Sequence, residues 1–156
     1  MIDTQNVKNQ DIISKIQNPL NFKVVDGKFT ADEVLNAYFD GKDSGKQDLK
    51  DLINRGLQLS SLSSNYLFEK LKNQTITVED MYLRFVTPTE FDTLIVISEE
   101  DYYSKEKRWN AYDYAREINK NIDDVLLNFS FIPNSDQIDY GIIASDGFIF
   151  KYEKQE

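Results

Sequence analysis

Residues 29–59 place apolar and small side chains at alternating steps of three and four along the chain. This spacing puts them on one face of an α-helix. The stripe consists of Val34, Tyr38, Gly41, Gly45, Leu49, Leu52, Gly56 and Leu59. We therefore expect a helix of roughly 28 residues, about 42 Å long at a rise of about 1.5 Å per residue. A helix of this length needs a cover for its apolar face, and that need constrains the rest of the fold.

The first turn of this stretch carries a helix-start signature. Thr30 is a favoured N-cap residue, and Glu33 can accept a hydrogen bond from the backbone N–H of the cap. Phe29 and Val34 occupy the two positions of a hydrophobic staple. We expect the helix to begin at Thr30.

The glycines of the stripe have two interpretations. Each glycine inside a helix costs about 1 kcal/mol relative to alanine, so Gly41, Gly45 and Gly56 suggest a face where another backbone approaches closely. Alternatively, two shorter helices break near Asp40–Gly45, where the sequence DGKDSG also has the composition of a turn. The sequence leaves open whether the chain's own sheet or a second copy covers the stripe.

A serine-rich run, Ser60–Asn65, follows the stripe. Serine and asparagine side chains compete with the helix for backbone hydrogen bonds, so they favour caps and turns. We expect a bend there, giving a helical hairpin or a kinked continuation. A second helix is predicted over about Ser64–Asn73.

From Thr75 onward the period of the hydrophobic pattern changes to two, which is typical of strands. One half-buried strand is predicted over 80–86 and ends before Pro88. The almost wholly apolar Asp92–Ile97 is predicted as a strand inside the sheet. The short connection between these two strands favours an antiparallel pair.

Ser98 begins a second helix-start signature, with Asp101 at the third helical position and a staple between Ile97 and Tyr102. The core side of this helix is formed by Ala111, Tyr112, Ala115, Ile118 and Ile122, and Trp109 and Tyr114 flank it. A further strand is predicted over Val125–Ile132. A strand, a long helix and another strand in succession permit a crossover with the two strands parallel.

The end of the chain is ambiguous between helix and strand. Ser135–Ser145 reads as a short helix with Gly147 as its C-cap, or as half of a hairpin that turns at Asp146–Gly147. We favour the helix. Phe148–Tyr152 is predicted as the last strand.

These elements predict an α+β fold in two layers. A long N-terminal helix or helical hairpin precedes a small mixed four-stranded sheet with a crossover helix. We expect a single domain over residues 29–156. It consists of a helical segment (29–74) and a sheet segment (75–156), preceded by an N-terminal arm (1–28).

The chain of 156 residues contains no cysteine and no histidine. Disulfides, thiolate zinc sites, cysteine nucleophiles, Ser–His triads and histidine metal sites are therefore excluded. Eighteen basic and 27 acidic side chains give a net charge of −9, and Lys105-Glu106-Lys107-Arg108 is the nearest approach to a basic cluster. Because phosphate binding needs clustered Lys and Arg, we expect no nucleic-acid partner.

The hydropathy pattern also bears on location. No apolar run is long enough to cross a membrane, and the N-terminal residues lack the basic and apolar regions of a signal peptide. We expect a cytoplasmic protein with no membrane partner.

Glu90-Phe91-Asp92, followed by the apolar Thr93–Ile97, resembles the acid–x–acid element of the nucleotidyltransferase palm. The resemblance implies that Glu90 and Asp92 would hold the metal ions that bridge nucleotide phosphates. The chain departs from that family's pattern, because Arg84–Pro88 contains no glycine to cradle phosphate and only Asn128 stands near the third carboxylate position. No complete catalytic constellation, cofactor site or metal site is therefore predicted, and Glu90 and Asp92 remain weak metal candidates.

A second resemblance is to small bacterial proteins of unknown function, carried by FTADEV near the start and DGFIFKYE near the end. It implies no activity. We therefore expect a non-enzymatic intracellular module for protein–protein interaction or oligomerisation, such as a homodimer. The interface candidates are Tyr38, Gly41, Gly45, Leu49, Leu52, Gly56, Trp109 and Tyr112.

Two alternative functions stay open at the level of the sequence. The net negative charge suits an acidic inhibitor or immunity-type protein that binds a basic partner. The palm resemblance suits a divergent nucleotidyltransferase-like domain that binds nucleotides.

Overall fold

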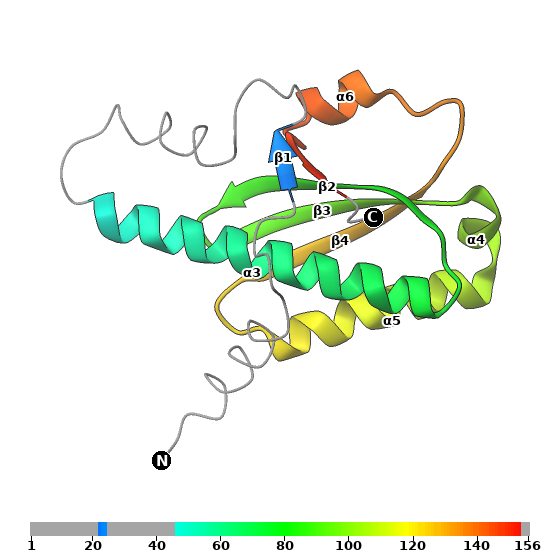
Figure 1. Ribbon diagram of the computed structural model, residues 1–156, viewed down its shortest axis with the longest axis horizontal. Helices are drawn as coiled ribbons and strands as arrows, with labels where there is room; N and C mark the ends of the chain where they lie inside the picture. Colours follow the sequence, from blue (N-terminus) through cyan, green and yellow to red (C-terminus); the bar gives the residue numbers. More distant parts are fainter. Residues whose placement is uncertain (1–21, 25–45, 154–156) are drawn as a thin grey trace, which may run out of the picture.

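The computed structural model describes residues 22–24 and 46–153. Helices α3 and α5 lie on one side of the sheet and α6 lies on the other (Figure 1). The elements in chain order are β1 (Phe22–Val24), α3 (Lys46–Asn73), β2 (Val78–Thr87), β3 (Glu90–Ile97), α4 (Glu99–Tyr103), α5 (Lys105–Asn121), β4 (Leu126–Pro133), α6 (Tyr140–Ser145) and β5 (Phe150–Tyr152).

The sheet has the strand order β1-β5-β2-β3-β4. Strands β2 and β3 pair antiparallel, and β3 and β4 pair parallel across the connection that contains α4 and α5. Strand β5 pairs antiparallel with β2 and with the short β1 at the edge. The predicted α+β fold with a mixed sheet is confirmed, and β1 adds one short edge strand to the four that were expected.

Helix α3 corrects the predicted helix boundaries. It has 28 residues but runs over Lys46–Asn73, so the bend expected at Ser60–Asn65 and the separate helix over Ser64–Asn73 are wrong. The serines are buried, and the Ser60 hydroxyl donates to the Gly56 carbonyl at 2.7 Å. Tertiary packing thus overrides the weak helix propensity of serine. The predicted start at Thr30 and the alternative break near Asp40–Gly45 lie outside the described residues.

Gly56 marks a close approach between α3 and the sheet. A Cβ atom at this position would lie 2.7 Å from Phe91 Cε2 and 2.7 Å from the Pro88 carbonyl oxygen. Only a residue without a side chain fits such an approach. At Gly56, the chain's own sheet therefore supplies the cover that the sequence left open.

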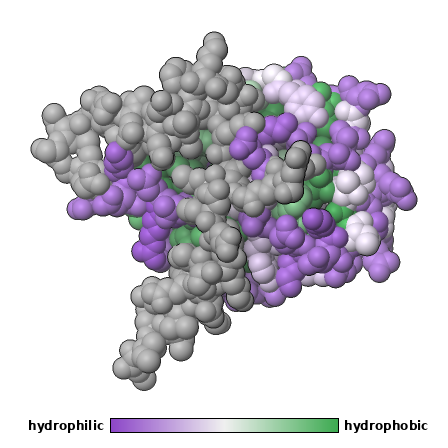
Figure 2. All heavy atoms as spheres, in the orientation of Figure 1, coloured by the Kyte–Doolittle hydropathy of each residue, from purple (hydrophilic) through white to green (hydrophobic). Residues whose placement is uncertain are grey.

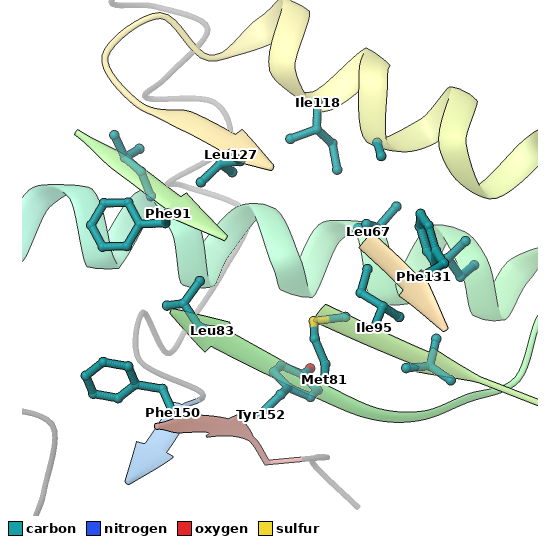
Figure 3. Close-up of a cluster of buried hydrophobic side chains, with 14 of the residues drawn as sticks. Leu67, Met81, Leu83, Phe91, Ile95, Ile118, Leu127, Phe131, Phe150 and Tyr152 are labelled. Atoms are coloured by element: carbon teal, nitrogen blue, oxygen red, sulfur yellow. The ribbon is translucent and has the colours of Figure 1, made fainter. Parts of the chain in front are cut away.

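The main core lies between the sheet and the pair α3 and α5. Side chains from α3, α5 and strands β2 to β5 converge there, and Figure 3 draws several of them. The labelled members are Leu67, Met81, Leu83, Phe91, Ile95, Ile118, Leu127, Phe131, Phe150 and Tyr152. A second, smaller cluster on the opposite face of the sheet contains Tyr82, Val96 and Ile143.

Strand β4 is an edge strand whose outer hydrogen-bonding groups are largely covered. Leu126 N donates to the Thr89 carbonyl, so the parallel ladder turns the backbone groups of Leu127, Phe129 and Phe131 outward. The Asn119 side chain donates to Leu127 O at 2.6 Å and accepts from Leu127 N at 3.2 Å. Phe131 is only 3% exposed, and Pro133 has no N–H. These features protect the edge against pairing with another chain.

The helix-start prediction at Ser98 is confirmed, because its hydroxyl accepts from Asp101 N at 3.2 Å. The helix is interrupted, however, by a second cap at Ser104, which accepts from Lys107 N at 3.4 Å. The result is the short α4 followed by α5. The helix favoured over the hairpin at Ser135–Ser145 is also found, as α6, although it starts only after Asp139. Gly147, with φ of 95°, follows its C-cap residue.

Helix α3 ends in a Schellman motif with an unusual residue. Ile76 N donates to Leu71 O and Thr75 N donates to Lys72 O, and Thr75 takes the left-handed conformation with φ of 58°. Glycine normally occupies this position, because a β-branched residue is strained there.

We predict that Thr75→Gly raises the free energy of unfolding by about 1 kcal/mol, because it removes this strain. Urea denaturation measures the change. Thr87→Gly, the same replacement at an exposed position in strand β2, serves as the control and should lower stability. A destabilised Thr75→Gly variant would contradict the strain argument.

Candidate functional site

The two carboxylates singled out by the palm resemblance lie within strand β3. Asp92 is paired in register with Arg84 on β2 and with Asn128 on β4. These three side chains and Glu90 therefore form one row on the face of the sheet that α6 partly covers. We call this set the polar row.

The hydrogen bonds of the polar row satisfy both carboxylates from within the protein. Asp92 accepts from Arg84 Nε at 2.9 Å and also from Arg84 Nη2. The Asn128 amide donates to Glu90 at 3.1 Å and to Asp92 at 2.9 Å. The Arg84 guanidinium thus lies against one oxygen of Asp92 and the Asn128 amide against the other, and the positive charge of Arg84 would repel a metal ion bound beside it. Among the described residues, no group of three or more acidic side chains is placed to hold a metal ion.

Arg84 also connects the polar row to the end of the chain. Its Nη1 donates to the Asp146 carbonyl oxygen at 3.0 Å, and its guanidinium lies 4.6 Å from the centroid of the Phe148 ring. The row therefore holds the segment after α6 against the sheet, which is a structural role.

The interface candidates on α3 fall into three groups. Leu49 and Leu52 are exposed, Leu52 by 42%. Gly56 faces Phe91 of the same chain, so it offers no surface to a partner. Tyr38, Gly41 and Gly45 lie outside the described residues.

The candidates on α5, Trp109 and Tyr112, are exposed aromatic residues in the first half of that helix, and Tyr103 at the end of α4 is a third. Tyr103 is 67% exposed, Trp109 54% and Tyr112 36%; we call these three side chains the aromatic surface. Tyr112 was expected on the core side, but it rests against the Phe131 ring with centroids 4.8 Å apart and keeps one side in solvent. Figure 2 shows that hydrophilic residues predominate on the face that it draws, with small hydrophobic areas between them.

The exposed leucines and the aromatic surface lie at opposite ends of the α3–α5 pair. Lys107, early in α5, donates to the Thr75 carbonyl just after α3. Arg55, in the first half of α3, pairs with Asp124 just after α5. The two helices are therefore antiparallel, and the candidates form two separate surfaces.

Asp101 fixes the position of the aromatic surface. Its buried carboxylate accepts from Thr77 N at 2.7 Å and pairs with the Lys107 ammonium. Burial raises the pKa of this carboxyl. The hydrogen bonds from Lys107, the Thr77 backbone and Ser98 outweigh that effect and hold the pKa below its ordinary value. The contact joins α4, α5 and the start of β2.

Sequence reasoning missed Arg84, Lys107, Asn119 and Asn128 as structural partners. Each is a single polar residue whose role depends on strand register or on helix packing. Asn128 was noticed only as a missing acid. No local sequence signal identifies such partners.

No protein-family model, curated protein or solved structure matches this chain. No helix within the described part of the chain is long and apolar enough to cross a membrane. The function must therefore be inferred from the surfaces themselves.

We predict that Asp101→Asn lowers the free energy of unfolding by about 1–3 kcal/mol near neutral pH, because it removes hydrogen bonds to a charged group. The folded-state pKa is lowered, so Asp101 contributes its stability above its ordinary pKa of about 4 and loses it as pH falls through the lowered value. Urea denaturation at several pH values should show a smaller loss on acidification for the variant than for the native protein.

Asp113→Asn is the matched control for this prediction. Its carboxylate pairs with Arg116 on the exposed side of α5, and exposed pairs contribute only about 0–1 kcal/mol. Equal acid sensitivity of the native protein and Asp101→Asn would contradict the role of the buried carboxylate.

Proposed function

We propose that this protein is a protein–protein interaction module that binds its partner through the aromatic surface. The observation that carries the proposal is that three exposed aromatic side chains, Tyr103, Trp109 and Tyr112, follow within ten residues of one another along α4 and the first half of α5. Aromatic side chains bury large areas on binding, and Tyr and Trp are enriched among the residues that dominate binding energy.

The way this surface is held supports the proposal. Ser98 and Ser104 cap the two helices, and the buried Asp101–Lys107 pair fixes their relative position. Arg108 donates to the Tyr102 carbonyl at 3.0 Å across the junction of α4 and α5. A surface ordered before binding loses less conformational entropy when a partner docks.

The proposal is tested by replacing Trp109 with a photo-crosslinking amino acid in the full-length protein, inside the cells that produce it. We expect a discrete covalent adduct, whose identity mass spectrometry then gives. A second copy of the chain is one of the partners that this experiment would reveal.

The control places the same amino acid at Lys120, which is exposed on the last turn of α5. Binding at the aromatic surface predicts an adduct at position 109 that is absent or much weaker at position 120. Equal adducts at both positions, or none at 109, would reject the proposal.

A further inference from the structure

We propose that residues 135–148, which carry α6 from β4 across the sheet to β5, form a lid. This lid opens as a unit from the second face of the sheet. Arg84 is the latch that keeps it closed. The proposal is independent of the aromatic surface, which lies on other elements.

The lid is attached by few buried contacts. Of its 14 positions, only Ile143 is buried. Ile138, Ile143 and Phe148 pack on Tyr82, Leu94, Val96 and Ile132, in a cluster separate from the main core. Segments with little buried apolar area open at a lower free energy than the core does.

The polar attachment of the lid is equally sparse. Among the described residues, one hydrogen bond joins 135–148 to the rest of the chain, from Arg84 Nη1 to the Asp146 carbonyl. The same guanidinium lies over Phe148 and is held by Asp92. Arg84 thus contacts the lid through a hydrogen bond and a cation–π interaction. Its ion pair with Asp92 keeps the guanidinium oriented.

Gly147 allows the lid to pass close to the Arg84 side chain. Its φ of 95° turns the chain after α6, and a Cβ atom there would lie 3.1 Å from Arg84 Cδ. Helix α6 has only six residues, too few to persist without support from the sheet. Detachment should therefore expose the amide hydrogens of α6 to solvent together.

Opening the lid would change what the second face presents. Tyr82 is 3% exposed and Val96 is fully buried while the lid is closed. Their uncovering, together with release of Arg84 from Asp146, would give this face an apolar strip beside the polar row. The closed lid therefore covers an apolar surface that is separate from the main core.

Amide hydrogen exchange of the full chain at increasing urea concentrations tests this inference. The amides of Ile143 and Phe148 are bonded within the lid, and those of β3 report on global unfolding. We expect the lid amides to exchange together, much faster than those of β3 and with a weaker dependence on urea. Exchange of both sets at one rate with one urea dependence would overturn the lid.

Arg84→Gln tests the latch, and it should accelerate exchange in the lid roughly tenfold, as expected for the loss of a hydrogen bond from a charged group. The ratio of lid to β3 exchange separates this effect from general destabilisation. Gly147→Ala, which disturbs the same contact from the lid side, should raise that ratio as well.

Arg55→Gln is the matched control, because it breaks the ion pair with Asp124 far from the lid. Its ratio of lid to β3 exchange should stay within about twofold of the native value, as for a distant site. An unchanged ratio in Arg84→Gln, or the same rise in Arg55→Gln, would overturn the role of Arg84.

Discussion

The close approach of α3 to the turn between β2 and β3 is the contact on which this fold depends. At Gly56 the helix touches the Phe91 ring and the Pro88 carbonyl, with no room for a side chain. One turn further along, Ser60 and then Ser64 keep the helix near the sheet, and Ser64 lies 3.4 Å from Thr93. Leu67 and Leu71 can then reach the main core, which α5 covers beside α3.

The small residues of α3 explain both what the sequence predicted and where it misled. The spacing indicated a buried helical face. Gly56 and Leu59 of that face are buried, but Leu49 and Leu52 are exposed. Serine propensity indicated a bend at Ser60–Asn65, but burial against the sheet outweighs propensities that differ by less than about 1 kcal/mol per residue. The Ser63 hydroxyl, buried without a hydrogen-bond partner, marks the cost of this packing.

The sheet was easier to predict, because its strands carry a clear alternation of side chains and the connections limit the pairing. The short connection favoured the antiparallel β2–β3 pair and the helical crossover permitted the parallel β3–β4 pair, and both pairs are found. The environment of Glu90 and Asp92 was not predictable, because it depends on the register that aligns Arg84, Asp92 and Asn128. A shift by one residue would turn each of them to the opposite face.

The two faces of the sheet differ in how they are covered. The face toward α3 and α5 holds the large core, and the start of α5 presents the aromatic surface outward. The other face is covered by α6 over a small cluster and one latch. The first face thus carries most of the buried apolar side chains, and the second face carries few.

The Gly56 contact can be tested by comparing Gly56→Ala with Gly141→Ala in urea denaturation. Both replacements favour a helix by about 1 kcal/mol, but only at Gly56 would the new Cβ meet a backbone oxygen and a buried ring at 2.7 Å. We predict that Gly56→Ala lowers the free energy of unfolding by about 1–3 kcal/mol, whereas Gly141→Ala changes it by less than about 1 kcal/mol. Unchanged or increased stability of Gly56→Ala would contradict the account.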